Sequence, residues 1–195
     1  MRAEKLKIFY DEEVYPPSED TLLLLEALEV KEGQQVLEVG TGSAYIAIHC
    51  ALHGADVTAC DVSETAIRNA MRNAEANNVK INFIVSDLFE KINGKFDVII
   101  FNPPYLPTAE QDKVVGNFNL ALDGGPDGSD VIRKFLADAW QFLKKEGVIY
   151  LLYSSHNTEA INQFKTMYSW QILKSRRFFF EELYVSLFKP IKEIS

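Results

Sequence analysis

The sequence predicts an α/β fold with a mostly parallel sheet that ends in an antiparallel hairpin. From residue 34 to residue 167, apolar runs of strand length alternate with amphipathic stretches of helix length, as they do in βαβ units. The final segment, WQILKSRRFFFEELYVSLFKP, contains two β-rich runs with no helix between them, which is typical of a hairpin. Because the sequence shows no repeat, low-complexity tract or linker, we expect residues 1–195 to form a single domain.

The individual elements follow from the same alternation. Strands are expected at residues 34–39, 55–61, 81–87, 95–101 and 147–153. Helices are expected between them at residues 43–53, 63–77, 128–145 and 157–167, so that they cover both faces of the sheet. The connection at 106–128 is longer than the roughly 12–15 residues usual in compact domains. We expect it either to contain a short helix or to act as a lid over a site.

Composition and charge limit the possible partners. With 195 residues, of which 47% are hydrophobic, the chain is large enough for a sizeable core. The formal net charge of −8 makes extended nucleic acid an unlikely partner, because proteins that grip a phosphate backbone usually carry a basic face. No apolar run is long enough to cross a bilayer, and the amino terminus does not lead into an apolar signal core. We therefore expect no membrane partner and a cytoplasmic location.

A metal or disulfide site is not expected from the cysteine and histidine residues. Cys50 and Cys60 are the only cysteines, too few for a disulfide scaffold or a thiolate cluster. His49 and His53 could face the same side of a helix, but AIHCALHGAD supplies no third ligand. We interpret them as ordinary helix residues.

A glycine turn follows the first predicted strand in EVGTGSAYIA, residues 38–47. Gly40 and Gly42 permit a tight turn whose backbone NH groups can approach a ligand closely. Asp61 lies 21 positions after Gly40, at the end of the second strand, where a carboxylate can accept hydrogen bonds from both hydroxyls of a ribose. This pair of features is shared by dinucleotide sites and S-adenosylmethionine (SAM) sites.

Two details favour SAM over a dinucleotide. The third glycine of a dinucleotide fingerprint is missing, since Ala44 stands in that region. Glu38 precedes the turn, where it would attract a sulfonium or amino group and repel a pyrophosphate. The third strand ends in Asp87 and Leu88, which could hydrogen-bond and flank an adenine. The alternative is that Asp61 and Asp87 only cap the helices that follow them.

The motif FNPPYLP, residues 101–107, ends the fourth predicted strand. Proline fixes its own φ and pushes the preceding residue into an extended conformation, so Asn102 is held in place. The Asn102 side-chain oxygen and the Pro103 carbonyl could together accept both hydrogens of one NH2 group. With Tyr105 against its plane, that nitrogen would be positioned for in-line attack on a sulfonium methyl, without a protein base. The alternative is that Asn-Pro-Pro is only a turn.

Taken together, EVGTGS, Asp61, SDLF and NPPY resemble the SAM-dependent methyltransferases, in which NPPY marks members acting on amide or base NH2 groups. VYPPSEDTLLLLEAL (14–28) and ALDGGPDGSDVIRKFL (121–136) resemble segments of the HemK-like family. That family methylates the glutamine of the Gly-Gly-Gln motif in class I translation release factors. The archaeal and eukaryotic branch lacks the extra amino-terminal helical domain of bacterial members, and we expect this chain to belong to that branch. The resemblance implies a Rossmann-like class I methyltransferase fold with a seven-stranded sheet.

The resemblance also implies roles for individual residues. The SAM site would comprise Thr21, Glu38, Gly40, Thr41, Gly42, Asp61, Val62, Asp87, Leu88 and Asn102. The glutamine amide would be bound by Asn102, Pro103, Pro104 and Tyr105. Ala44 departs from the glycine that is commonest in the family's turn.

Members of this branch typically work with a small zinc-binding activator that adds to the edge strand, here Ile81 to Val85. The alternative is that this strand is covered by its own chain. The run Phe178 to Phe180 is expected to belong to the core and not to an interface.

Two other functions remain open at the level of the sequence. One is methylation of an adenine or guanine amino group in nucleic acid, because a flipped base presents a similar NH2 group. The acidic charge and the absence of an added target-recognition region disfavour it. The other is a catalytically silent SAM-binding or scaffold protein, which would not need Asn102 and Tyr105.

Overall fold

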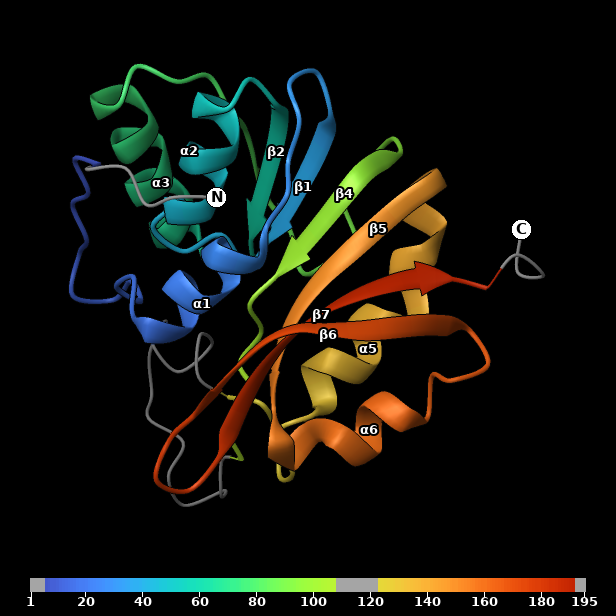
Figure 1. Cartoon of the computed structure of the whole chain (residues 1–195). Helices are drawn as coiled ribbons and strands as arrows, with labels where there is room; N and C mark the ends of the chain where they lie inside the picture. Colours follow the sequence, from blue (N-terminus) through green and yellow to red (C-terminus); the bar gives the residue numbers. More distant parts are fainter. Residues whose placement is uncertain (1–5, 108–122, 192–195) are drawn as a thin grey trace.

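Seven strands form one sheet with helices packed on both of its faces (Figure 1). The computed structural model describes residues 6–107 and 123–191. The strands are β1 (Gln35–Val39), β2 (Asp56–Asp61), β3 (Asn82–Val85), β4 (Phe96–Phe101), β5 (Leu143–Ser154), β6 (Tyr168–Arg177) and β7 (Glu182–Pro190). The helices are α1 (Glu19–Ala27), α2 (Tyr45–Leu52), α3 (Glu64–Ala76), α5 (Asp130–Asp138) and α6 (Thr158–Asn162), with 3-10 turns at Ala139–Phe142 and Ser155–Asn157.

The strand order is β3-β2-β1-β4-β5-β7-β6. The first five strands in this order are parallel, whereas β7 runs antiparallel to both β5 and β6. The predicted fold class, a mostly parallel seven-stranded sheet with a carboxyl-terminal antiparallel hairpin, is therefore confirmed. The predicted edge strand is also confirmed, since β3 pairs only with β2 among the described strands.

The core lies in two layers, one on each face of the sheet. Successive residues of β4 alternate between them: Val98 and Ile100 pack beneath α1 and α2, while Ile99 and Phe101 pack with Phe135 of α5. Figure 1 shows α1, α2 and α3 on one side of the sheet and α5 and α6 on the other. This period of two in burial explains why the strands read as nearly continuous apolar runs.

Two predicted helices are shorter than expected. The helix expected at 128–145 ends at Asp138, and a 3-10 turn leads into β5, which begins at Leu143. Leu143 pairs with Phe96 of β4, so tertiary pairing converts the LKKEG segment into strand. The helix expected at 157–167 covers only Thr158–Asn162.

The expectation that Phe178 to Phe180 belong to the core is wrong for two of the three residues. Phe179 and Phe180 have relative exposures of 102% and 93%. They lie in the turn between β6 and β7, where both side chains are open to solvent. Only Phe178 packs against the core.

The register of the parallel strands brings several strand ends to one edge. Val39, the last residue of β1, pairs with Cys60 of β2 and with Phe101 of β4. The segments that follow these strands therefore start side by side, as in other open parallel sheets. Most of the long connection expected at 106–128 lies outside the described residues. Among the described helices, none has the length and apolar character needed to span a membrane.

Candidate functional site

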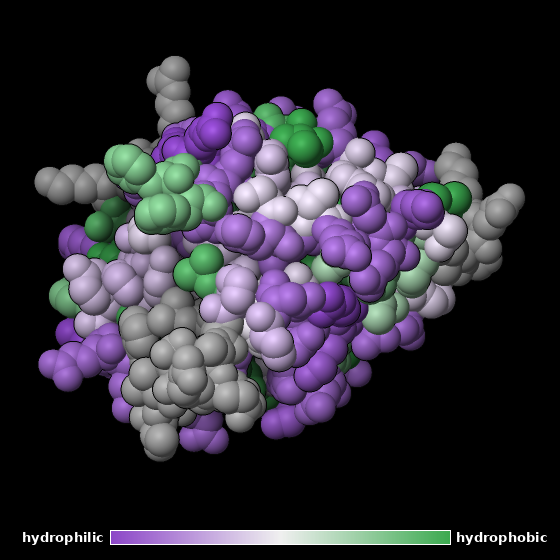
Figure 2. All heavy atoms as spheres, turned by 90° about the horizontal axis from the view of Figure 1, so that it is seen from below, coloured by the Kyte–Doolittle hydropathy of each residue, from purple (hydrophilic) through white to green (hydrophobic). Residues whose placement is uncertain are grey.

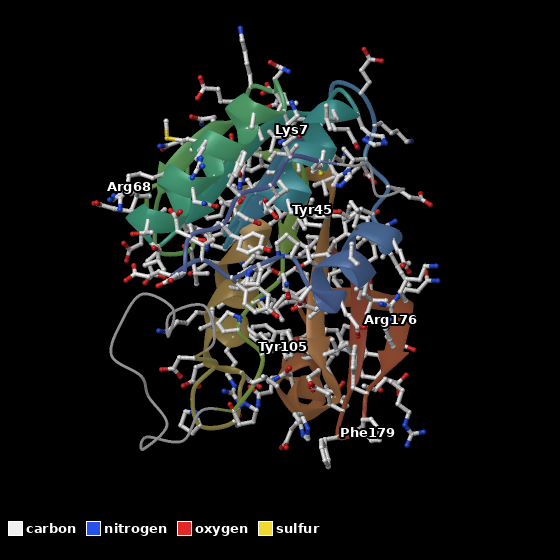
Figure 3. All side chains as sticks on the ribbon, turned by 90° about the vertical axis from the view of Figure 1, so that its left-hand side faces the viewer. Lys7, Tyr45, Arg68, Tyr105, Arg176 and Phe179 are labelled. Atoms are coloured by element: carbon white, nitrogen blue, oxygen red, sulfur yellow. The ribbon has the colours of Figure 1, made fainter. Side chains whose placement is uncertain are left out.

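A cleft of about 350 Å³ lies at the edge where β1, β2, β3 and β4 end. All of the site residues predicted from the sequence line it. They are Thr21, Glu38, Gly40, Thr41, Gly42, Asp61, Val62, Asp87, Leu88, Asn102, Pro103, Pro104 and Tyr105. Figure 3 shows Tyr45 and Tyr105, which also line the cleft, on the side of the molecule that carries α1.

The glycine turn after β1 has the left-handed backbone that its sequence indicates. Gly40 and Gly42 have φ values of +63° and +52°. A Cβ on Gly40 would lie 3.1 Å from the ring of Phe101, so a side chain there would crowd the floor of the cleft. Ala44 has φ 62° and takes the conformation that glycine adopts more readily, at a cost of about 1–2 kcal/mol. The turn geometry is therefore preserved without the glycine that is commonest at this position.

Glu38 is buried, with a relative exposure of 6%. Its Oε2 accepts hydrogen bonds from the Thr41 hydroxyl and from the Ala47 backbone NH. Burial raises the pKa of Glu38 to about 8, although these hydrogen bonds act in the opposite direction. Near pH 7 the carboxyl group is therefore mostly neutral, whereas the sequence suggested a permanent negative charge. A cation bound beside it would restore the charge.

Asp61 accepts hydrogen bonds from the surrounding backbone and also lines the cleft. Its Oδ2 accepts a hydrogen bond from Gly42 NH, and its Oδ1 accepts one from Ser63 NH at the start of α3, each at 2.9 Å. A carboxylate has about four acceptor positions, so capacity for a ligand remains. The helix-capping alternative and the ligand-binding prediction are thus compatible for this residue.

After β3, the chain turns sharply into the cleft. Leu88 has φ 43°, an uncommon value for a residue with a side chain. Its carbonyl oxygen accepts a hydrogen bond from the Ser86 hydroxyl at 3.1 Å. This turn places Asp87 and Leu88 on the wall of the cleft.

The carboxamide of Asn102 has one satisfied end and one free end. Its Nδ2 donates to Asp20 Oδ2 at 3.2 Å. Its Oδ1 is buried and has no hydrogen-bond donor among the described residues. Because Asp20 can only accept when ionised, it fixes which end of the amide is free. An acceptor oxygen without a donor among the described residues therefore lies at the end of β4.

Asp20 was not predicted as a site residue. It lies in the first turn of α1, is 5% exposed, and lines the same cleft. Its Oδ1 accepts from Ser18 and Thr21, and its Oδ2 also accepts from the Tyr15 and Tyr105 hydroxyls at 3.5 and 3.4 Å. An acidic residue at a helix start usually indicates only favourable interaction with the helix dipole. No spacing rule connects position 20 with position 102.

Tyr105 is held at both its hydroxyl and its backbone. Burial and the nearby Asp20 carboxylate raise the pKa of Tyr105 far above its usual value, so the hydroxyl keeps its proton. The backbone carbonyl of Tyr105 accepts a hydrogen bond from Asn157 Nδ2 at 3.1 Å. A fixed aromatic ring with a protonated hydroxyl can pack against a planar group, but it is no base.

The predicted helix residues near the cleft have packing roles. The ring of His49 packs edge-on against Tyr45, with 4.8 Å between ring centroids. Cys50 and Cys60 are buried free thiols, and burial raises the pKa of Cys60 to about 12. In the two described stretches, no three His, Cys, Asp or Glu residues are grouped so that they could hold a metal ion.

Comparisons with known proteins find similarity over most of the chain. The family model of the methyltransferase small domain matches residues 16–175. A protein of Methanocaldococcus jannaschii, whose name proposes protein N5-glutamine methyltransferase activity, is 43% identical over 95% of this chain and 96% of its own length. The E. cuniculi Mtq2–Trm112 complex, described as responsible for methylating the termination factor eRF1, matches with a TM-score of 0.72 and 26% identity. That match covers 92% of this chain and 99% of the solved chain.

A bacterial relative is longer than the matched region. The release factor glutamine methyltransferase of Streptococcus pneumoniae is 38% identical over 72% of this chain, but the match covers only 54% of that protein. The present chain therefore spans about half the length of this curated relative.

Asn157 joins the parts that surround the cleft. Its Nδ2 donates to the carbonyls of Tyr105 and Gly128, and its Oδ1 accepts from Ser154 NH at 2.8 Å. We expect Asn157→Ala to lower the free energy of unfolding by about 1–3 kcal/mol, because buried polar groups lose their partners. Denaturant unfolding checks this, with the exposed Asn162→Ala as the control. Equal stabilities of the two variants would contradict the assigned role.

Proposed function

Because the chain belongs to the family of the methyltransferase small domain, we propose that it methylates the side-chain amide of a glutamine with SAM as methyl donor. The proposed acceptor is the glutamine of the Gly-Gly-Gln motif in a class I translation release factor, with residues 1–195 acting as one catalytic domain. The names of the relatives support this acceptor. A release factor as substrate also implies a cytoplasmic location, which is part of the proposal.

The cofactor is S-adenosylmethionine, which solved structures of fold neighbours hold as AdoMet or its product. When bound, it supplies a methyl group activated on a sulfonium. The residues of the cleft fit this cofactor. The left-handed glycine turn lets the backbone approach a ligand closely, and Asp61 and Asp87 offer acceptor oxygens for hydroxyl and amino groups. We propose that Glu38 lies near the cationic end, with Thr21 and Thr41 beside it. Val62 and Leu88 would flank the adenine.

The unpaired Oδ1 of Asn102 carries the proposal for the acceptor. One hydrogen of the glutamine NH2 would be accepted by this oxygen and the other by the Pro103 carbonyl. Two hydrogen bonds would hold the nitrogen in place. Tyr105 and Pro104 would restrict the orientation of the amide plane. Such positioning is a large part of catalysis in a near-attack geometry, up to about 7–11 kcal/mol in favourable cases.

Deprotonation by the protein before transfer is not required by this arrangement. The amide nitrogen, with its hydrogens held by Asn102 and Pro103, would attack the methyl carbon with its own lone pair. The methyl–sulfur bond would break with its electrons staying on sulfur, and the cationic N-methyl product would then lose a proton to water. Tyr105 keeps its proton, and Asp20 is already an acceptor for Asn102, Tyr15 and Tyr105. The role of Asp20 is thus positioning of the carboxamide.

We also propose that a small zinc-binding activator adds to the free edge of β3. Among the described strands, β3 pairs only with β2, and Phe83, Ile84 and Val85 are half-buried along it. An uncovered edge strand invites pairing with another chain. The relative Mtq2 was solved in complex with Trm112, which supports a partner of this kind.

The acceptor is tested by incubating the chain with radiolabelled SAM and a purified release factor, with and without the co-expressed activator. We expect label on the glutamine of Gly-Gly-Gln, located by mass spectrometry. Asn102→Ala should reduce kcat by about a hundredfold or more, because the nitrogen is no longer held, while SAM still binds. Asn162→Ala is the control. Label on RNA instead of the factor would support the nucleobase alternative, and full activity of Asn102→Ala would exclude the proposed role.

Glu38 predicts a pH dependence of SAM binding. Its pKa of about 8 in the free protein falls when a cation binds nearby, so binding below pH 8 releases a proton. Affinity should therefore rise from pH 6 to pH 8 by up to about tenfold per unit. Calorimetry in buffers of different ionisation enthalpy measures the released proton. The amino group of SAM contributes the same proton release with wild type and with Glu38→Gln, so the difference between the two proteins is the contribution of Glu38. Equal proton release by the two proteins would refute the prediction.

The edge-strand proposal predicts a specific loss of activator binding. Phe83→Asp places a charge on β3 and should reduce co-purification of the activator by about tenfold or more, since edge pairing would bury that charge. Ile172→Asp, on the opposite edge strand β6, is the control and should leave binding unchanged. Circular dichroism checks that both variants are folded. Undiminished co-purification with Phe83→Asp would argue against β3 as the docking edge.

A further inference from the structure

A second hollow, of about 240 Å³, adjoins the cleft on the far side of Asp20 and Tyr105. These two residues line both spaces, so they separate the cleft from the hollow. The opposite wall of the hollow comes from the β6–β7 hairpin, through Phe178 and Glu181. The hollow therefore lies next to Tyr105, one of the residues proposed to hold the acceptor amide.

The hollow is acidic. Glu19, Asp20 and Glu181 line it, and none of its described lining residues is basic. Glu181 Oε2 is buried and has no hydrogen-bond donor among the described residues. A buried carboxylate oxygen without a partner is costly, and here the local chain does not supply one. The charge of Glu181 also acts on Tyr105. Burial and Asp20 make larger contributions to the raised pKa of the Tyr105 hydroxyl, and Glu181 raises it further.

The basic residues of the hairpin do not neutralise this charge. Arg176 donates to Glu26 of α1 at 3.3 Å, and Arg177 pairs in strand register with Glu182. Neither residue lines the hollow. Because no described lining residue of the hollow is basic, a bound molecule could supply a cation to Glu181 there.

An apolar rim stands next to the acidic hollow. Phe179 and Phe180 are 102% and 93% exposed, and their ring centroids are 6.5 Å apart. Figure 3 shows Phe179 at the tip of the hairpin, beyond Tyr105, pointing away from the body of the protein. The face seen from below is mostly hydrophilic, with separate apolar groups (Figure 2). Adjacent exposed aromatic residues beside a pocket are typical of binding surfaces.

We propose that this hollow and the Phe179–Phe180 rim bind the segment of the substrate protein that flanks the acceptor glutamine. The inference rests on the proposed function and adds the chemistry of the flanking residues. The segment carries a lysine or arginine that pairs with Glu181, and an apolar side chain that packs on the two phenylalanines. The hollow thus aligns the main chain, while Asn102 holds the amide.

The test uses the full chain with co-expressed activator, labelled SAM and a full-length release factor. Glu181→Gln keeps the size of the side chain but removes its charge, and we expect KM for the factor to rise about tenfold with kcat changed less than twofold. The double variant Phe179→Ser/Phe180→Ser should raise KM similarly. SAM affinity should be unchanged in both. The matched controls are Glu146→Gln, at the opposite end of β5, and Ile172→Ala on β6.

A charge-reversal experiment separates direct contact from an indirect structural effect. Neutralising the basic residue beside the glutamine of the factor should raise KM for wild type but not further for Glu181→Gln. Glu181→Arg should recover with a factor that carries glutamate at that position. KM values within twofold of wild type for both hollow variants would overturn the inference while leaving the proposed function intact. If wild type leaves the factor unlabelled under all conditions, the proposed function fails and the inference fails with it.

Discussion

The orientation of one carboxamide determines what this site can bind. An asparagine side chain can present either an acceptor oxygen or a donor nitrogen, and only the oxygen can hold an NH2 group. Asp20 settles the choice, because its carboxylate accepts from Asn102 Nδ2 and so leaves Oδ1 directed elsewhere. A hydroxyl at position 20 could donate or accept and would fix nothing. The chemistry at the end of β4 thus depends on a residue 82 positions away in sequence.

The fold makes this long-range contact possible. Parallel pairing of β1 with β2 and β4 brings three strand ends together, and α1 packs where β5, β6 and β7 meet the same layer. Its first turn therefore reaches the strand ends from the hairpin side. The same placement makes Asp20 part of the wall between the cleft and the second hollow. The start of α1 thereby contacts Asn102 and lines both the cleft and the hollow beside the hairpin.

The strand-end residues could be predicted because parallel strands bring their carboxyl ends to one edge whatever the details of packing. Gly40, Asp61 and Asn102 were placed at this edge in this way, and all three line the cleft. Asp20 could not be, since it precedes the first strand and no local pattern says where α1 packs. The charge state of Glu38 depends on burial, which is a tertiary property. Phe179 and Phe180 were misassigned because hydrophobicity alone does not distinguish a core residue from one at an uncovered hairpin turn.

Three carboxyl groups along the cleft and the hollow lie in different environments. Glu38 is kept neutral by burial until a cation is beside it, Asp20 is satisfied by internal donors, and Glu181 has a buried oxygen that no described residue satisfies. The first and third are therefore complementary to positive charge that a bound molecule brings. Since unpaired polar burial weakens the free protein and binding restores partners, ligands of both spaces should stabilise the fold beyond their contact area. On the proposed function, the free protein would lose some stability through these carboxyl groups, and a bound sulfonium and a bound basic segment would restore it.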